Sequence, residues 1–153
     1  MFKHRMESSS LKSWKFPDKH MSTIFAKIIS GDIPAFKVAE NDDFLAFLDI
    51  NPLRMGHTLV IPKQEIDYFF DITPDDLAKM MEFTSSVAKA IKLAYPCKKV
   101  GMTVIGLEVP HAHIHLVPMD GMADMNFSGP KLNPSMEELG EAAKRILASI
   151  AAK

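Results

Sequence analysis

The chain has one cysteine, one tryptophan and almost no net charge, and each shortage excludes a class of protein. Cys97 has no second cysteine in the chain to pair with, which excludes a disulfide scaffold and a zinc site built from several cysteines. The formal net charge of −1 gives no general attraction to nucleic acid or to an anionic membrane. No apolar run approaches the roughly 20 residues that a helix needs to cross a bilayer.

The remaining composition is that of a folded globular domain. Apolar residues make up 47% and charged residues 24% of the 153 residues, which is an ordinary balance. A chain of this length buries about two thirds of its unfolded surface, so it needs no disulfide or metal to hold it together. We expect a single domain over residues 22–153.

The first 21 residues differ from the rest. Residues 1–20 hold five Lys or Arg and two acids, a net of +3, and they contain no apolar run of the kind that a secretory signal has. We interpret residues 1–21 as a flexible N-terminal extension. The absence of paired cysteines and of a secretory signal favours a cytoplasmic location.

Alternation and turn residues predict five strands, at 36–40, 44–49, 57–61, 100–105 and 111–117. Typical capping sequences at Thr73 and Ser135 begin two long helices, over about 74–95 and from 135 to about 150. A shorter helix is expected between Thr23 and Gly31. Because the first three strands follow one another through short connections, we predict an antiparallel meander with helices packed on it, an α+β fold.

Three of the six histidines alternate with apolar residues in the run 111–117, which reads HAHIHLV. On a strand, His111, His113 and His115 share one face and the apolar side chains share the other. Packing explains the apolar face but not a row of imidazoles, because crowded histidines disfavour one another's protonation. Two interpretations stay open: a metal site with a distant third ligand, or nucleophilic catalysis at phosphorus by an imidazole with a pKa of about 6.5.

The histidine run resembles the signature of the histidine triad (HIT) superfamily of nucleotide hydrolases and transferases. Three further blocks, in the same order, resemble its Hint-like branch: Thr23–Ile29 with Ile33-Pro34, Phe47–Pro52 and Gly56–Lys63. The resemblance covers about residues 22–120. It implies the HIT-like fold with a five-stranded antiparallel sheet, and a two-fold dimer in which the helix at 74–95 and the strand at 100–105 meet their mates.

The resemblance also implies roles for individual residues. His113, the middle histidine, would attack the α-phosphate of a purine nucleotide and form a nucleotidyl-histidine intermediate that water hydrolyses. His111 and His115 would orient the nucleophile and contact the phosphate or the leaving group, with His57 in support. Asp49 would accept hydrogen bonds from the ribose hydroxyls. The slot for the base would be apolar and formed by Ile24, Phe25, Ile28, Phe47 and Ile50.

Two segments depart from the family pattern. Before the triad, where the family commonly has a glutamine and a serine or threonine after glycine, this chain has Gly106-Leu107-Glu108. Leu107 cannot donate a hydrogen bond to phosphate, and an ionised Glu108 repels it. After the triad, residues 119–134 lack the tryptophan-bearing segment of the eukaryotic Hint proteins and lead into a helix instead.

These departures leave the substrate open. A purine nucleoside phosphoramidase is the preferred interpretation, and a dinucleoside polyphosphate hydrolase is the alternative within the same chemistry. A nucleotide-binding regulatory protein with little turnover and a zinc hydrolase are alternatives of other classes. The preferred chemistry requires no metal and no other cofactor. The expected partners are the nucleotide and a second copy of the chain, not nucleic acid or a membrane.

Overall fold

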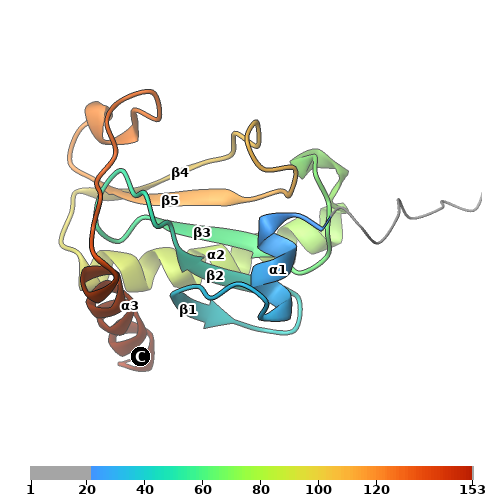
Figure 1. Cartoon of the computed structure of the whole chain (residues 1–153), viewed down its shortest axis with the longest axis horizontal. Coiled ribbons are helices and arrows are strands. Elements are labelled where there is room, and N and C mark those ends of the chain that lie inside the picture. Colours follow the sequence, from blue (N-terminus) through green and yellow to red (C-terminus); the bar gives the residue numbers. More distant parts are fainter. Residues whose placement is uncertain (1–21, 153) are drawn as a thin grey trace, which may run out of the picture.

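The computed structural model describes residues 22–152, so the predicted extension at 1–21 lies outside the described residues. In chain order the elements are α1 (Ile24–Ser30), β1 (Lys37–Glu40), β2 (Phe44–Leu48), β3 (Thr58–Pro62), η1 (Phe69–Asp71), α2 (Pro74–Ala94), β4 (Lys99–Thr103), β5 (Ile114–Met119), η2 (Met122–Met125) and α3 (Met136–Ala151). The predicted five strands and two long helices are confirmed, and the short first helix is present as well (Figure 1).

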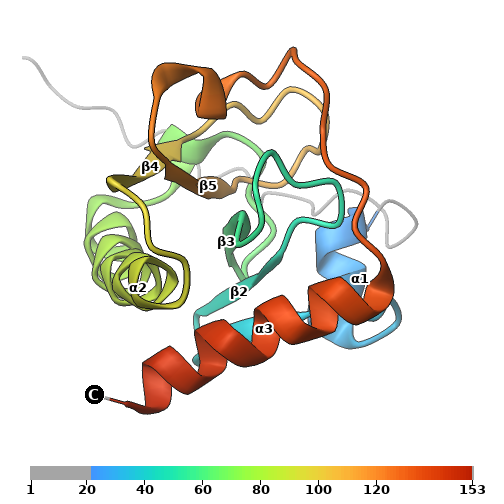
Figure 2. The same ribbon diagram turned by 90° about the vertical axis from the view of Figure 1, so that its left-hand side faces the viewer.

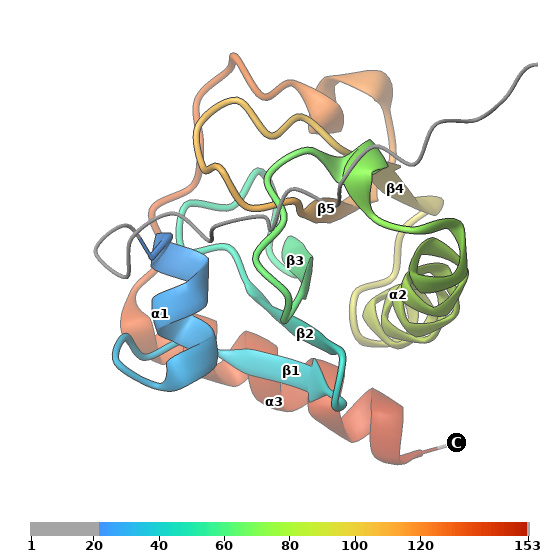
Figure 3. The same ribbon diagram turned by 90° about the vertical axis from the view of Figure 1, so that its right-hand side faces the viewer.

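The five strands form one antiparallel sheet in the order β1-β2-β3-β5-β4. The helices α1 and α2 lie on opposite faces of this sheet (Figure 3). Helix α3 runs across the end of the molecule where β1 and β2 lie, and it packs on α2 as well (Figure 2). The strands β3 and β5 are therefore interior neighbours, while β4 forms an edge, and His57 and His113 immediately precede β3 and β5 in the chain.

The helix ends follow the capping signals in the sequence. The hydroxyl of Thr73 accepts a hydrogen bond from the amide of Asp76 at the start of α2, and Ser135 and Glu138 form a capping box at the start of α3. At the end of α1, Gly31 has a φ of 85°, a left-handed conformation that glycine adopts without strain. The local sequence thus sets where each helix begins and where α1 stops.

The sheet separates two hydrophobic clusters. The larger one fills the space between the sheet, α2 and α3, and includes Val60, Met80, Ile91 and Ile146. The smaller one lies under α1 and consists of Phe25, Ile28, Leu45, Phe47, Leu59 and Ile61. The strands β2 and β3 are buried on both faces, each face against one of the two clusters, and this burial of apolar surface, at about 25 cal/mol per Å², holds the sheet between them.

Two strand boundaries differ from the prediction. Strand β5 begins at Ile114 rather than at His111, because the amide of His111 donates to the carbonyl of Val109 in a tight turn and not to a neighbouring strand. Strand β4 ends at Thr103, and the chain then turns at Gly106, whose φ is +71°. No helix in residues 22–152 is long and apolar enough to cross a membrane.

Candidate active site

A cavity of about 340 Å³ opens over the smaller cluster, on the side of the sheet that carries α1. The loop after β2, the strand β5 and the two loops at 105–109 and 127–131 all contribute to its wall. The lining side chains are Ile24, Phe25, Asp49, Asn51, Leu59, Ile105, Leu107, Glu108, Val109, His113, His115, Phe127 and Lys131. The cavity therefore brings together residues that are far apart in the sequence and gathers both charged and apolar groups.

His113 is held in one tautomer by the backbone. Its Nδ1 lies 2.7 Å from the carbonyl oxygen of His111, and a carbonyl only accepts, so Nδ1 carries the hydrogen. The lone pair of the neutral ring is then on Nε2. The residue is 6% exposed, and the ring of Phe25 meets its ring edge-on at 5.1 Å between centroids. Nε2 of His113 is the nitrogen that can act as a nucleophile in this cavity.

His57 and His115 form a second, linked pair. The amide of Leu53 donates to Nδ1 of His57 at 3.0 Å, so the hydrogen of the neutral ring is on Nε2. That Nε2 lies 3.0 Å from Nδ1 of His115 and donates to it, which leaves the hydrogen of His115 on its own Nε2. Burial lowers the pKa of His57 to about 4 and that of His115 to about 3, so both rings are neutral at pH 7. His115 therefore carries an N–H donor on the ring that lines the cavity.

His111 has a different position from the other two. It is fully buried, with Nε2 donating to the carbonyl of Pro62 at 2.9 Å and Nδ1 accepting from the hydroxyl of Thr23 at 2.9 Å. The amide of Thr23 in turn donates to Glu65, 3.1 Å away. Both ring nitrogens of His111 are thus occupied by the protein, and the residue is absent from the lining of the cavity. It connects α1 to the end of β3, and the expected contact with phosphate finds no support in this geometry.

Asp49 has one carboxylate oxygen fixed and one turned toward the histidines. Oδ1 accepts from the amide of Asn51 at 2.9 Å, and Oδ2 lies 3.7 Å from Nε2 of His57. Burial raises the pKa of Asp49 above its ordinary value. The hydrogen bond from Asn51 fixes the orientation of the carboxylate, and the side chain lines the cavity as the sequence predicts for a ribose-binding residue.

The five residues predicted for the base slot divide into three groups. Ile24 and Phe25 line the cavity. Ile28 and Phe47 lie in the cluster beneath it, with the rings of Phe25 and Phe47 5.4 Å apart. Ile50 is 59% exposed and does not line the cavity. Leu59, Ile105 and Val109, which the resemblance did not single out, add apolar surface.

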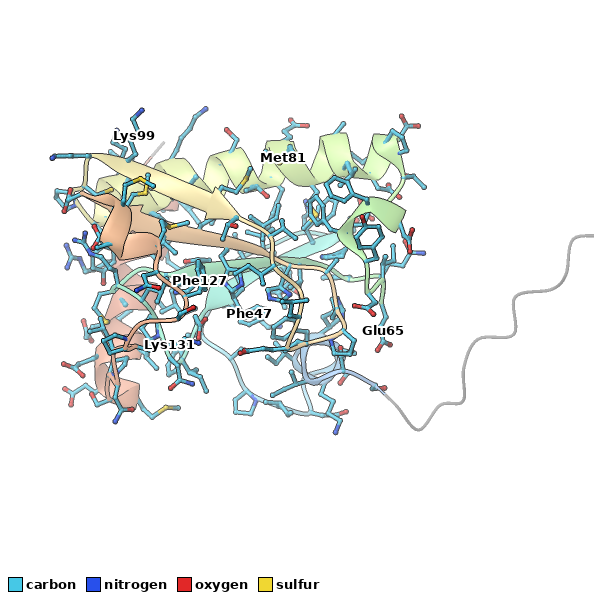
Figure 4. All side chains as sticks on the ribbon, turned by 90° about the horizontal axis from the view of Figure 1, so that it is seen from above. Phe47, Glu65, Met81, Lys99, Phe127 and Lys131 are labelled. Carbon is cyan, nitrogen blue, oxygen red and sulfur yellow. The ribbon has the colours of Figure 1, made fainter. Side chains whose placement is uncertain are left out.

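Phe127 and Lys131 are site residues that the sequence did not reveal. Both lie between η2 and α3, on the side of the sheet opposite to α2 and Met81 (Figure 4). The ring of Phe127 packs 4.8 Å from that of His115 and 6.0 Å from that of His57. The segment 119–134 has no periodicity, and only its long-range contacts bring it to the cavity. In the sequence the only pattern that this segment shows is its turn residues, and these do not predict contact with the cavity.

One group of side chains in the described part of the chain has a donor set for a metal ion. Asp49, His57 and His115 each offer a ligand atom, and these atoms all lie within 4.8 Å of one another. In the neutral tautomers, however, the hydrogen bond between His57 and His115 uses one nitrogen of each ring. A metal ion would have to displace that hydrogen, since imidazole binds metals through an unprotonated nitrogen.

Comparison with known proteins identifies the family. The family model of the HIT domain matches residues 30–122 of this sequence. The chain belongs to the HIT domain family. It is 36% identical over 129 residues to adenosine 5'-monophosphoramidase of Saccharomyces cerevisiae, which covers 83% of this chain and 82% of the relative. The predicted HIT membership is therefore confirmed.

Solved structures of HIT proteins have the same fold. A HIT-like protein from Bartonella henselae, described as involved in cell-cycle regulation, matches with a TM-score of 0.72 and 32% identity over 83% of this chain and 95% of its own. A zinc-bound histidine triad family protein from Mycobacterium smegmatis matches with a TM-score of 0.74 and 29% identity over 86% of this chain and 94% of its own. The predicted HIT-like sheet is confirmed by these neighbours.

Proposed function

We propose that this HIT protein is a nucleotide hydrolase that acts at the α-phosphate of purine nucleotides, with nucleoside phosphoramidates as its preferred substrates. The observation that carries the proposal is the hydrogen bond from Nδ1 of His113 to a backbone carbonyl, which places the lone pair of the neutral ring on Nε2 in a side chain that lines the cavity. Similarity to the adenosine 5'-monophosphoramidase of Saccharomyces cerevisiae supports the choice of substrate.

The proposed reaction has two steps at one phosphorus atom. Nε2 of His113 attacks the α-phosphorus, and the bond to the leaving amine breaks as the bond to Nε2 forms, with the amine taking up a proton from solvent as it leaves. Water then attacks the same phosphorus and gives up a proton to solvent, which releases the nucleoside monophosphate and returns the lone pair to Nε2. In both steps the N–H of His115 donates to a phosphoryl oxygen, and His57 keeps that hydrogen on the correct nitrogen of His115.

The proposed binding mode uses the rest of the cavity. The carboxylate of Asp49 accepts hydrogen bonds from the ribose hydroxyls, since an ionised carboxylate accepts and never donates. The base lies against Ile24, Phe25 and Leu59, which offer an apolar surface next to the triad. No metal or other cofactor takes part in this scheme.

Two measurements test the proposal. Steady-state hydrolysis of adenosine phosphoramidate is compared with that of diadenosine polyphosphate, and we expect the larger kcat/KM for the phosphoramidate. In the second measurement, the enzyme turns over a substrate that carries a label on its α-phosphate, and alkaline denaturant stops the reaction. The label should then remain on His113, where peptide mapping identifies it. Turnover without a labelled histidine contradicts the covalent mechanism.

Two other outcomes would redirect the assignment. Preference for the polyphosphate would make the chain a dinucleoside polyphosphate hydrolase. Binding of AMP without turnover of either substrate would indicate a regulatory nucleotide-binding protein, and the negative charge of Glu108 beside the cavity is the feature that favours this alternative.

We also propose that the protein forms a two-fold homodimer through α2 and β4. Strand β4 is an edge of the sheet with unpaired backbone groups on one side. Large apolar side chains are exposed nearby, with Phe70 at 71%, Met81 at 41% and Met102 at 51%. Sedimentation should give a dimer that Met102→Asp weakens and Met122→Asp, on η2, does not. A monomeric wild-type chain at micromolar concentration would contradict the proposal.

A further inference from the structure

The cavity has an outer wall formed by Leu107, Glu108 and Lys131. The lysine of this wall has no role in the proposed reaction. Lys131 lines the same cavity as His113 and His115. Within residues 22–152 its ammonium makes no ion pair, whereas Lys37 and Lys63 both pair with Glu40. Most exposed lysines are solvated surface groups without a function. A role for Lys131 therefore needs support from the structure around it as well as from its charge.

The backbone beside Lys131 is tied to the active site. The amide of Leu132, the next residue, donates to the carbonyl of Pro52 at 2.9 Å, in the loop that follows Asp49. On the other side, the ring of Phe127 packs on that of His115. The start of the segment is held by Arg54, which pairs with Asp120 at 3.1 Å and Asp124 at 2.9 Å. The main chain is thus fixed on both sides of Lys131.

The charge of Lys131 acts on the catalytic groups. Burial is the main cause of the lowered pKa of His57 and of His115, and the positive charge of Lys131 adds to it as the second cause for His57 and as the smallest cause for His115. The same charge also opposes the effect of burial on the pKa of Asp49. Lys131 lines the same cavity as Asp49 and His115, so a phosphate bound in that cavity is within the field of its charge.

The cavity needs such a cation because positions 107 and 108, on the same outer wall, supply no side-chain donor. Leu107 is 88% exposed and has no polar side-chain atom, and Glu108 brings a negative charge. Apart from the N–H of His115, the side chains of the triad leave a phosphate with few donors, since His113 presents a lone pair and His111 is fully engaged. Negative charge on the transferring phosphate is stabilised by donors and cations placed at its oxygens.

We propose that the ammonium of Lys131 binds the α-phosphate oxygens of the substrate and stabilises their charge as His113 attacks, in place of the donors that are absent at positions 107 and 108. This inference rests on the proposed nucleotide-hydrolase function. It makes Lys131 a catalytic residue contributed by the segment after the triad, and it explains why that segment is fastened to the loop after Asp49.

Comparing a ligand with and without a phosphate tests the role of Lys131. Binding of AMP and of adenosine is measured by calorimetry for the wild type, Lys131→Gln and Lys131→Arg. Lys144→Gln, on α3 and away from both the cavity and the proposed dimer interface, is the matched control. Loss of one charge-assisted contact predicts about tenfold weaker AMP binding in Lys131→Gln. Adenosine binding should be unchanged, with partial recovery for AMP in Lys131→Arg and no effect of Lys144→Gln.

Kinetics give a second measurement on the same variants. With adenosine phosphoramidate, kcat/KM should fall by about 10- to 100-fold in Lys131→Gln, because the contact strengthens as charge develops. Equal losses for AMP and adenosine would mean that Lys131 only supports the fold, and unchanged AMP binding would mean that it is a solvated lysine. Either result overturns the inference while leaving the proposed function in place. A wild-type chain that neither binds AMP nor hydrolyses the phosphoramidate would instead overturn the proposed function, and this inference with it.

Discussion

The two walls of the cavity are built in opposite ways. On the inner wall, His113 is buried, as is His57, which is hydrogen-bonded to the lining residue His115, and a backbone amide or carbonyl decides which ring nitrogen of each carries the hydrogen. On the outer wall, Leu107 is almost fully exposed, and Glu108 and Lys131 have no ion-pair partner within the described residues. Hydrogen bonds to the backbone fix the ring orientations and tautomers of His57 and His113, whereas no ion pair within residues 22–152 holds the charged side chains of the outer wall, although the main chain beside Lys131 is fastened.

This contrast separates two parts of the function. A nucleophile must be held in one tautomer before substrate arrives, because any reorganisation adds to the barrier. Groups that face the leaving group can differ in charge and shape without disturbing the nucleophile. We therefore expect substitutions on the inner wall to abolish the reaction and substitutions on the outer wall to change its rate or its substrate.

The largest effect is expected for His113→Ala. Removing an obligatory nucleophile should lower kcat by at least about 10³-fold. AMP binding should persist, because the base surface and Asp49 are unchanged. Single-turnover kinetics with adenosine phosphoramidate measure the first effect and calorimetry the second. A variant that folds normally and keeps more than a few per cent of the wild-type rate would show that His113 is not the nucleophile.

Asp49→Asn is expected to have the next largest effect, on binding. An amide keeps the hydrogen bond from Asn51 but no longer accepts from both ribose hydroxyls. Loss of a charge-assisted contact predicts ribonucleotide binding that is weaker by about 10- to 100-fold. The 2′-deoxynucleotide should bind the two proteins almost equally. If both nucleotides lose affinity to the same extent, the carboxylate serves the loop and not the ribose.

Much of the inner wall could be predicted from the sequence. Alternation correctly places Ala112, Ile114 and Leu116 in the larger cluster and His113 and His115 on the cavity side, although β5 itself begins only at Ile114. Alternation depends only on the period of the strand and is therefore visible locally. His111 also lies on the α1 side, where its ring meets that of Phe25, but alternation does not reveal that it is withdrawn from the cavity, because the groups that bind its ring belong to Pro62 and Thr23, far away in the sequence.

The outer wall could not be predicted for the same physical reason. Phe127 and Lys131 lie in a segment with no repeating pattern, and they reach the cavity only through the ion pairs of Arg54 and the hydrogen bond from Leu132 to Pro52. Contacts of this kind join distant residues and leave no periodic signal in the sequence. Ile50 shows the converse, since its place in a matching block suggested a lining residue, but its side chain is 59% exposed.

The protonation of the inner wall predicts how stability changes with pH. His57 and His115 have pKa values lowered to about 4 and about 3 in the folded protein, against about 6.5 when unfolded. At a pH between the folded and the unfolded pKa values, the unfolded chain binds more protons than the folded protein does. The free energy of unfolding is therefore highest above pH 6.5 and falls as the pH is lowered. The slope is up to about 1.4 kcal/mol per pH unit for each histidine.

Urea unfolding at pH 7.5, 6.5 and 5.5 measures this slope in a range where most carboxyl groups scarcely titrate. The matched variant is His57→Asn, which removes one titrating ring and should make the slope smaller. An unchanged slope in the variant would mean that His57 is not held neutral by burial, and that the tautomers of the inner wall are less firmly fixed than the hydrogen bonds indicate.

The smallest effect is expected on the outer wall, where Leu107→Gln combined with Glu108→Ser should raise phosphoramidase kcat/KM by about tenfold. The double change removes a negative charge and adds donors where charge develops, and one well-placed donor is worth as much as 10²–10³ in rate. The gain is smaller here because both side chains lie at the outer wall and Leu107 is 88% exposed. Glu108→Gln alone distinguishes the causes through its pH–rate profile. A faster enzyme would mean that Glu108 repels the phosphate, and an unchanged one that it is uninvolved. A slower enzyme that loses one limb of the profile would mean that Glu108 protonates the leaving amine, and the double variant should then lose activity.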